Sequence, residues 1–180
     1  MRRLAAVLLA PSIACASPEP RAAPDGATPA CSVGVEVDTR GWHAVVDDDF
    51  TFRLPPGFTE DEVQGIDSKV RQWSHPDGRT LMFDYGWYSS TLEEFRSNPD
   101  ASECAAQIGA RAATIASARG FADDPDPNAA WLVGATWREL QGGGDGSPST
   151  HLTMVGRAAD RAGLEELAAA MRSTTFQLDD

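Results

Sequence analysis

Apolar and polar residues alternate along several segments after residue 48, and this alternation predicts β-strands. Residues 49–54 place Phe50, Phe52 and Leu54 on one side and polar residues on the other. Because successive side chains of a strand point to opposite faces, this segment is predicted to be a half-buried strand. Pro55-Pro56-Gly57 follows and ends it, since proline cannot donate to a strand ladder.

A β-hairpin is predicted over residues 69–88. Lys69–Ser74 and Thr80–Tyr88 flank His75–Arg79 (HPDGR), whose Pro, Asp and Gly favour a tight turn. Four large apolar residues of the second strand share one face: Leu81, Phe83, Tyr85 and Trp87. We expect this face to be buried, with the ring of Phe83 packed in a sheet–helix core against residues such as Leu167 or Met171.

The Ala-rich stretch 103–119 allows two interpretations. Alanine is the best helix former, which favours a helix. Ile108-Gly109-Ala110-Arg111 instead has the pattern of a turn between two short strands, and we predict a hairpin here. Just before this stretch, Thr91-Leu92-Glu93-Glu94 fits a capping box and predicts a short helix that continues through Phe95.

The last third of the chain predicts another hairpin and a helix. Residues 131–137 alternate as a strand. After the flexible loop 141–149 (QGGGDGSPS), residues 151–157 return as its partner strand. Asp160 can cap a helix that has four residues on one apolar face: Leu164, Leu167, Ala168 and Met171. A short strand over 174–178 closes the chain. The predicted fold class is α+β, an antiparallel sheet built from hairpins with the C-terminal helix packed on one face.

Three segments carry a family resemblance: residues 50–58 (FTFRLPPGF), 108–111 (IGAR), and 164–167 (LEEL) followed by Phe176. The region from Asp48 to Leu178 resembles small bacterial envelope lipoproteins with a PsbP-like fold. The resemblance implies a compact antiparallel sheet packed with helices. The superfamily includes the extrinsic photosystem II subunit and many exported proteins of unknown role, and no catalytic residue can be carried over from it.

The N-terminal residues 1–16 have the layout of an export signal. Arg2-Arg3 precedes the apolar run Leu4–Ala10, and small residues follow. Ser12-Ile13-Ala14-Cys15 resembles a lipobox, in which Cys15 becomes lipidated, whereas Ala14-Cys15-Ala16 also allows ordinary cleavage after Ala16. Either way, the sequence predicts export, with the lipoprotein form anchored at the periplasmic or cell-surface side of a membrane and the other form secreted or periplasmic.

Residues 17–30 (SPEPRAAPDGATPA) predict a solvated, semi-rigid tether, because they are rich in Pro and Ala and contain almost nothing to bury. Residues 31–180 are then one globular domain. The net charge of −12 disfavours nucleic acid and anionic membrane surfaces as partners, since the overall field repels phosphate. The one membrane contact expected is an N-terminal lipid anchor.

The chain carries none of the common hydrolase, zinc, redox or P-loop motifs. The candidate ligand-binding residues are Asp84, Tyr88 and His75. Asp84 and Tyr88 point away from the predicted core face, beside the aromatic residues Tyr85 and Trp87. The first hypothesis is therefore a non-enzymatic binding or accessory module for an envelope protein or a small ligand. The alternative is an enzyme whose site is assembled from distant loops, for example with Asp84 and His75 as an acid/base pair.

No cofactor is expected, although one loop has spaced oxygen ligands. Asp124, Asp126 and Asn128 match the first positions of a calcium loop, but the Gly and the bidentate Glu of that loop are missing. Asp47-Asp48-Asp49 is a second acidic cluster, which would contribute only if folding brought the two together. An acidic loop is the simpler interpretation, with weak calcium binding as the alternative.

The cysteine count predicts one disulfide. Both cleavage schemes remove Cys15 from thiol chemistry, which leaves Cys31 and Cys104 as an even pair in an oxidising compartment. A loop of this length would stabilise the domain by roughly 4 kcal/mol in the chain-entropy model.

Mass mapping without reduction is expected to find Cys31 linked to Cys104 in protein taken from its native compartment. Cys31→Ser is expected to lower the melting temperature, because it removes the crosslink from the unfolded chain. Two free thiols in that preparation would contradict the pairing.

Overall fold

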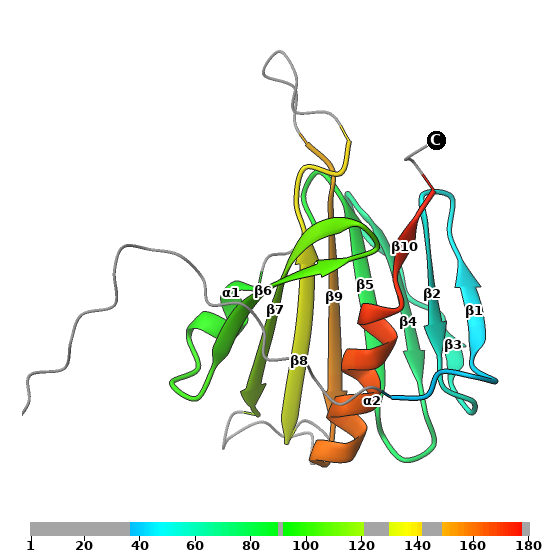
Figure 1. Ribbon diagram of the computed structural model, residues 1–180, viewed down its shortest axis with the longest axis vertical. Helices are drawn as coiled ribbons and strands as arrows, with labels where there is room; N and C mark the ends of the chain where they lie inside the picture. Colours follow the sequence, from blue (N-terminus) through cyan, green and yellow to red (C-terminus); the bar gives the residue numbers. More distant parts are fainter. Residues whose placement is uncertain (1–36, 90–91, 121–129, 142–148, 178–180) are drawn as a thin grey trace, which may run out of the picture.

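The computed structural model describes residues 37–89, 92–120, 130–141 and 149–177 (Figure 1). Within these ranges the chain forms antiparallel strands and two helices, which confirms the predicted α+β class. The strands are β1 (His43–Val46), β2 (Phe50–Leu54), β3 (Thr59–Asp61), β4 (Lys69–Ser74), β5 (Thr80–Gly86), β6 (Ser102–Ile108), β7 (Arg111–Arg119), β8 (Trp131–Trp137), β9 (His151–Ala158) and β10 (Thr175–Phe176). The helices are α1 (Glu93–Arg96) and α2 (Arg161–Arg172).

The strands form two antiparallel sheets. The larger sheet has the order β3-β4-β5-β9-β8-β7-β6, and the smaller one has the order β1-β2-β10. Helix α2 and the smaller sheet lie against the same face of the larger sheet (Figure 1). Their apolar side chains share one core. Sequence patterning did not predict β1 and β3, and β10 is shorter than the predicted strand 174–178.

Aromatic side chains from β2, β4 and β5 form the centre of this core. The ring of Phe83 is fully buried, as predicted, and meets Phe50 edge-on at 5.1 Å between ring centroids. Phe52 packs edge-on against Trp73 at 5.4 Å and against Phe83 at 6.4 Å. Leu167 and Met171 of α2 belong to the same buried cluster. Edge-to-face pairs add to the stabilisation from area burial, so this cluster holds β2 of the smaller sheet against β4 and β5 of the larger one.

The Ala-rich stretch is the hairpin β6–β7, as predicted. Ile108 pairs with Arg111, and the two residues between them have positive φ angles, 58° at Gly109 and 63° at Ala110. This is the turn geometry that matches the twist of a hairpin. A Cβ at Gly109 would lie 2.5 Å from the backbone oxygen of Thr174, so glycine is also required by the close approach of the C-terminal strand.

The predicted capping box before α1 is wrong. The N-cap residue is Leu92, whose side chain makes no capping hydrogen bond, and Thr91 lies outside the described residues. Burial fixes the helix instead. Leu92 and Phe95 pack on the far face of the larger sheet in a second apolar cluster that includes Ala116 and Leu132.

Helix α2 begins as predicted. The Asp160 carboxylate accepts a hydrogen bond from the backbone N–H of Gly163 at 2.8 Å. Leu164, Leu167 and Met171 face the sheet and are buried. Neither helix in the described ranges is long and apolar enough to cross a membrane.

Trp87 corrects the prediction that the whole aromatic face of 80–88 is buried. Its side chain is 59% exposed, because β5 ends at Gly86 and the chain then leaves the sheet. The backbone at Gly86 lies so close to Ser68 that a Cβ would be 3.1 Å from the Cβ of Ser68. Asp84 lies on the face opposite Phe83, but it is not a freely exposed residue, since its Oδ1 is buried.

Phe83→Ala is expected to cost about 3–5 kcal/mol in free energy of unfolding, because it removes a fully buried aromatic ring. Trp87→Ala is the matched control on the same hairpin and is expected to change stability by less than about 1 kcal/mol, since its ring is largely solvated. Urea unfolding of both variants measures the difference. Equal losses would mean that the aromatic core does not join the sheets.

Candidate functional site

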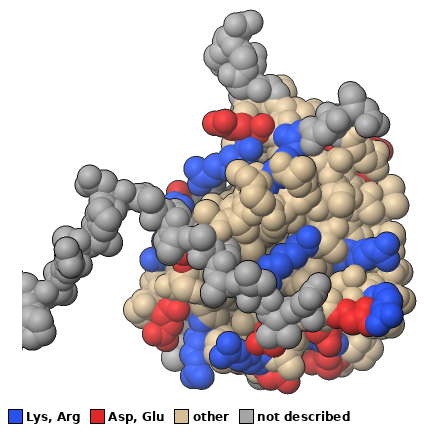
Figure 2. Space-filling view, viewed as in Figure 1, with Lys and Arg blue, Asp and Glu red and all other residues tan. Residues whose placement is uncertain are grey.

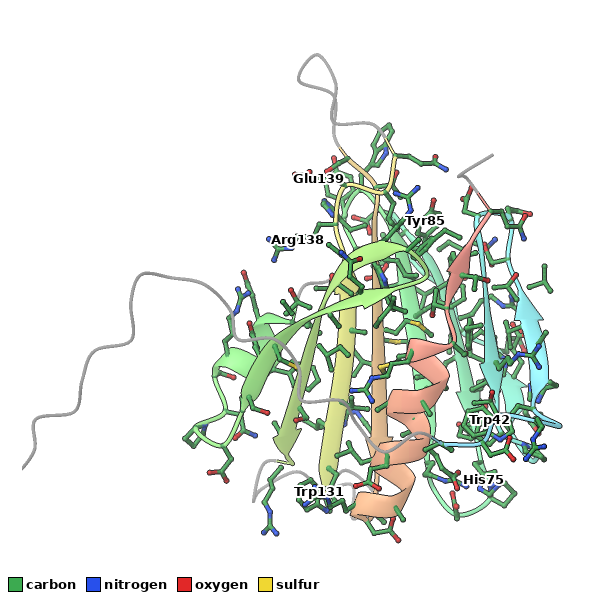
Figure 3. The ribbon with its side chains drawn as sticks, viewed as in Figure 1. Trp42, His75, Tyr85, Trp131, Arg138 and Glu139 are labelled. Atoms are coloured by element: carbon green, nitrogen blue, oxygen red, sulfur yellow. The ribbon has the colours of Figure 1, made fainter. Side chains whose placement is uncertain are left out.

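A groove of about 530 Å³ lies at the end of the larger sheet where β5 stops. It is formed by the β1–β2 turn, the segment before β4, the end of β5 and the two ends of the β8–β9 connection. Its lining residues are Asp49, Ile66, Asp67, Ser68, Lys69, Tyr85, Gly86, Trp87, Gln141 and Thr150. We call it the β5-end groove. Figure 3 labels Tyr85, which marks its position near the upper end of the sheet.

The floor of the groove is a hydrogen-bonded group centred on Asp49. The Tyr85 hydroxyl bonds to the Asp49 carboxylate, and Nε2 of Gln141 donates to Oδ1 of Asp49 at 3.1 Å. Burial, the hydrogen bond to Asp49 and the charges of Asp49 and Asp47 raise the pKa of Tyr85 above its ordinary value, and they outweigh the charge of Arg111, which lowers it. Tyr85 therefore stays protonated and acts as a hydrogen-bond donor.

The positive charge in the groove is already compensated. Lys69 is the one cationic side chain among the described lining residues, and its Nζ donates to Oδ1 of Asp47 at 2.8 Å. It also lies 3.4 Å from Oδ2 of Asp48. The Asp47 side chain is only 1% exposed and lies 3.6 Å from Arg71 as well. The hydrogen bond from Asp47 raises the pKa of Lys69, so the ammonium stays charged and bound to this carboxylate.

The rim of the groove carries exposed apolar side chains. Ile66 is fully exposed, Trp87 is 59% exposed, and Tyr88, which directly follows Trp87, is 70% exposed. These three are among the five large hydrophobic residues that the described part of the chain exposes. A grouped, exposed set of this kind marks an interaction surface more often than an isolated exposed residue does.

The structure separates the predicted candidate residues. Tyr88 lies beside the β5-end groove, whereas Asp84 lies on the opposite face of the sheet, where Ser89 donates to its backbone oxygen at 2.8 Å. Asp84 pairs with Val70 in the β4–β5 ladder, five residues before His75, a separation of roughly 16 Å along the strand. Figure 3 shows His75 at the end of the molecule away from Tyr85. Asp84 and His75 therefore do not form an acid/base pair.

His75 belongs to an ion-pair group that ties the β4–β5 turn to α2. Its Nδ1 lies 2.7 Å from Oδ1 of Asp77, and its ring packs against Phe58. Arg79 bonds both to Asp77 and to Glu166 of α2. Burial raises the pKa of Asp77, but hydrogen bonds from Arg79 and His75 outweigh it and lower this pKa to about 2. The group fixes the turn, and within it the Nδ1 of His75 is already engaged with Asp77.

One serine–histidine contact carries no sequence signal, because the two residues belong to no catalytic motif and lie two positions apart at the start of β9. Oγ of Ser149 lies 3.3 Å from Nε2 of His151. A catalytic dyad needs a group that orients the histidine through its other nitrogen. The Nδ1 of His151 is buried and has no hydrogen-bond partner in the described part of the chain, so this contact lacks that group.

The metal and cysteine predictions fall largely outside the described residues. Asp124, Asp126 and Asn128 lie there, as do Cys15 and Cys31. Within the described ranges, no three His, Cys, Asp or Glu side chains are grouped to hold a metal ion. Cys104 is in the disulfide-bonded form, and its partner is not a described residue, so the pairing with Cys31 stays a prediction.

Charge is mixed on the face that carries α2. Figure 2 shows positive and negative side chains interspersed there, so the acidic excess of the chain does not form one continuous acidic face on this side. No protein-family model matches the chain, and no curated protein matches it. The PsbP-like resemblance therefore stays a prediction from the sequence.

Asp77→Asn is expected to destabilise the protein at neutral pH, with a difference from the unchanged protein that shrinks in acid. The pKa of Asp77 is about 2 when folded, against an ordinary value of 3.8. A lowered pKa stabilises the fold above pH 3.8, and this contribution is lost as the pH falls from 3.8 towards 2.

Urea unfolding of both proteins across this range measures the effect. Asp100→Asn is the control, because Asp100 is exposed and forms no ion pair with a described residue. A difference that is constant down to pH 2 would contradict the role given to Asp77.

Proposed function

We propose that this protein is a non-enzymatic binding module, and that the β5-end groove is its binding site. The observation that carries the proposal is the exposed Trp87 ring beside the prepared polar floor of Asp49, Tyr85 and Gln141. Tryptophan is enriched at binding hot spots, and burying an exposed ring against a partner releases much ordered water.

The floor favours binding over chemistry. Tyr85 stays protonated, and the Lys69 ammonium is bound to Asp47, so neither group is prepared to act as a base or a nucleophile. The groove is also open to solvent, whereas chemistry generally needs water to be excluded. The floor does supply hydrogen-bonding groups in fixed positions, because Tyr85, Asp49 and Gln141 are hydrogen-bonded to one another. Such preorganisation lowers the entropic cost of binding.

The proposal includes the compartment that the sequence predicts. An exported chain with a lipidated Cys15 and the tether 17–30 would hold the domain clear of a membrane, and its ligand would be an envelope protein or a small molecule.

Photo-crosslinking in the native envelope tests the site. A benzophenone amino acid at position 87 is expected to capture a ligand or partner, because this ring projects from the rim of the groove. The same amino acid at position 53 is the control, since Arg53 is exposed on β2 away from the lining residues. Equal capture at both positions, or capture at position 53 alone, would contradict the groove as the site.

A further inference from the structure

We infer that the β5-end groove docks a basic segment of a partner protein, with a Lys or Arg side chain over the groove and apolar neighbours on its rim. The inference rests on the proposed function and names the chemistry of the partner.

The first reason is that two carboxylates of the groove have no ion-pair partner among the described residues. Asp49 is held by the hydroxyl of Tyr85 and the amide of Gln141, which are neutral donors. Asp67 is exposed and forms no ion pair with a described residue. Lys69 cannot neutralise either one, because its ammonium is bound to Asp47 and Asp48. Among the described residues, therefore, neither carboxylate forms an ion pair, and the charge of Arg111 acts only at longer range on Tyr85 beside Asp49.

The second reason is the aromatic ring beside these carboxylates. The Trp87 side chain is largely exposed and lines the same groove as Asp49 and Asp67. A cation over the face of an indole is attracted by the ring's quadrupole, and nearby carboxylates add to that attraction. The combination recognises a guanidinium or ammonium group. It would reject an anion, which the two carboxylates repel.

The shape of the site favours a protein segment. Small ligands are held in concave sites that bury most of their surface, but this groove is open. Two further exposed apolar residues follow or precede groove residues in the sequence: Tyr88 follows Trp87, and Val46 lies shortly before Asp49. An aromatic centre with a polar surround is the anatomy of a protein interface. The chain's net charge of −12 would also attract a basic partner from a distance.

Three capped synthetic pentapeptides test the inference on the full chain. Each alternates Leu with one other residue: Lys in the first, Gln in the second and Glu in the third. The indole N–H resonance of Trp87 is the readout, assigned with Trp87→Phe. We expect the Lys peptide to shift this resonance with an affinity about tenfold higher than the Gln peptide, and the Glu peptide to leave it unchanged. Added salt should weaken the Lys peptide most, since exposed charges are screened.

Asp67→Asn is the decisive variant, because this exposed carboxylate has no structural partner among the described residues. It is expected to weaken the Lys peptide about two- to fivefold, as for an exposed ion pair. Asp100→Asn removes the same charge from a residue that does not line the groove and is expected to leave the affinity for the Lys peptide unchanged. Melting curves check that both variants are folded.

Two outcomes would overturn the inference. If the Gln peptide binds as tightly as the Lys peptide and Asp67→Asn has no effect, the groove binds apolar segments, so the proposed function stands while the basic partner is wrong. If none of the peptides moves the Trp87 resonance at about 10 mM, the groove does not dock such segments. The crosslinking at position 87 then decides the proposed function separately.

Discussion

The packing of β2 against the β4–β5 hairpin is the interaction on which the rest of the structure depends. Phe50 and Phe52 of β2 meet Phe83 and Trp73 edge to face, and this contact joins the small sheet to the large one. The same contact fixes the turn that precedes β2. Asp49 can reach Tyr85 only because Phe50, the next residue, is packed in the core. The burial of Phe50 against Phe83 thus positions Asp49 in the polar floor of the groove.

Local sequence patterns were sufficient to predict most of the strands and the C-terminal helix, but not the residues that form the β5-end groove. Alternation predicted β2, β5 and β8. Turn and loop signals predicted their neighbours β4 and β9, and a two-residue turn signal at Gly109 outweighed the helix propensity of the alanines around it. These features depend on neighbours in the sequence. β1 and β3 were missed because they are short and expose most of their side chains, so they carry no alternating apolar pattern.

The errors at the site have a common physical origin. Trp87 continues the alternating apolar pattern of β5, but the strand ends at Gly86, where the backbone packs on Ser68. Beyond the end of a strand, alternation no longer determines which side chains are buried. The floor combines Asp49, Tyr85 and Gln141 from three separate elements, a tertiary arrangement that no local pattern records. His75 and Asp84 are close in the sequence, yet the length of the hairpin and the pleat of the strand separate them.

The pairing of β2 with β10 bears on the order in which the chain folds. It joins Thr51 to Thr175, so one of the first strands of the domain is completed by one of the last. Closing so long a loop is slow, and the aromatic residues of β2 remain incompletely covered until the C-terminal strand is in place. A chain that is synthesised from its N-terminus therefore cannot complete the smaller sheet until β10 has been made.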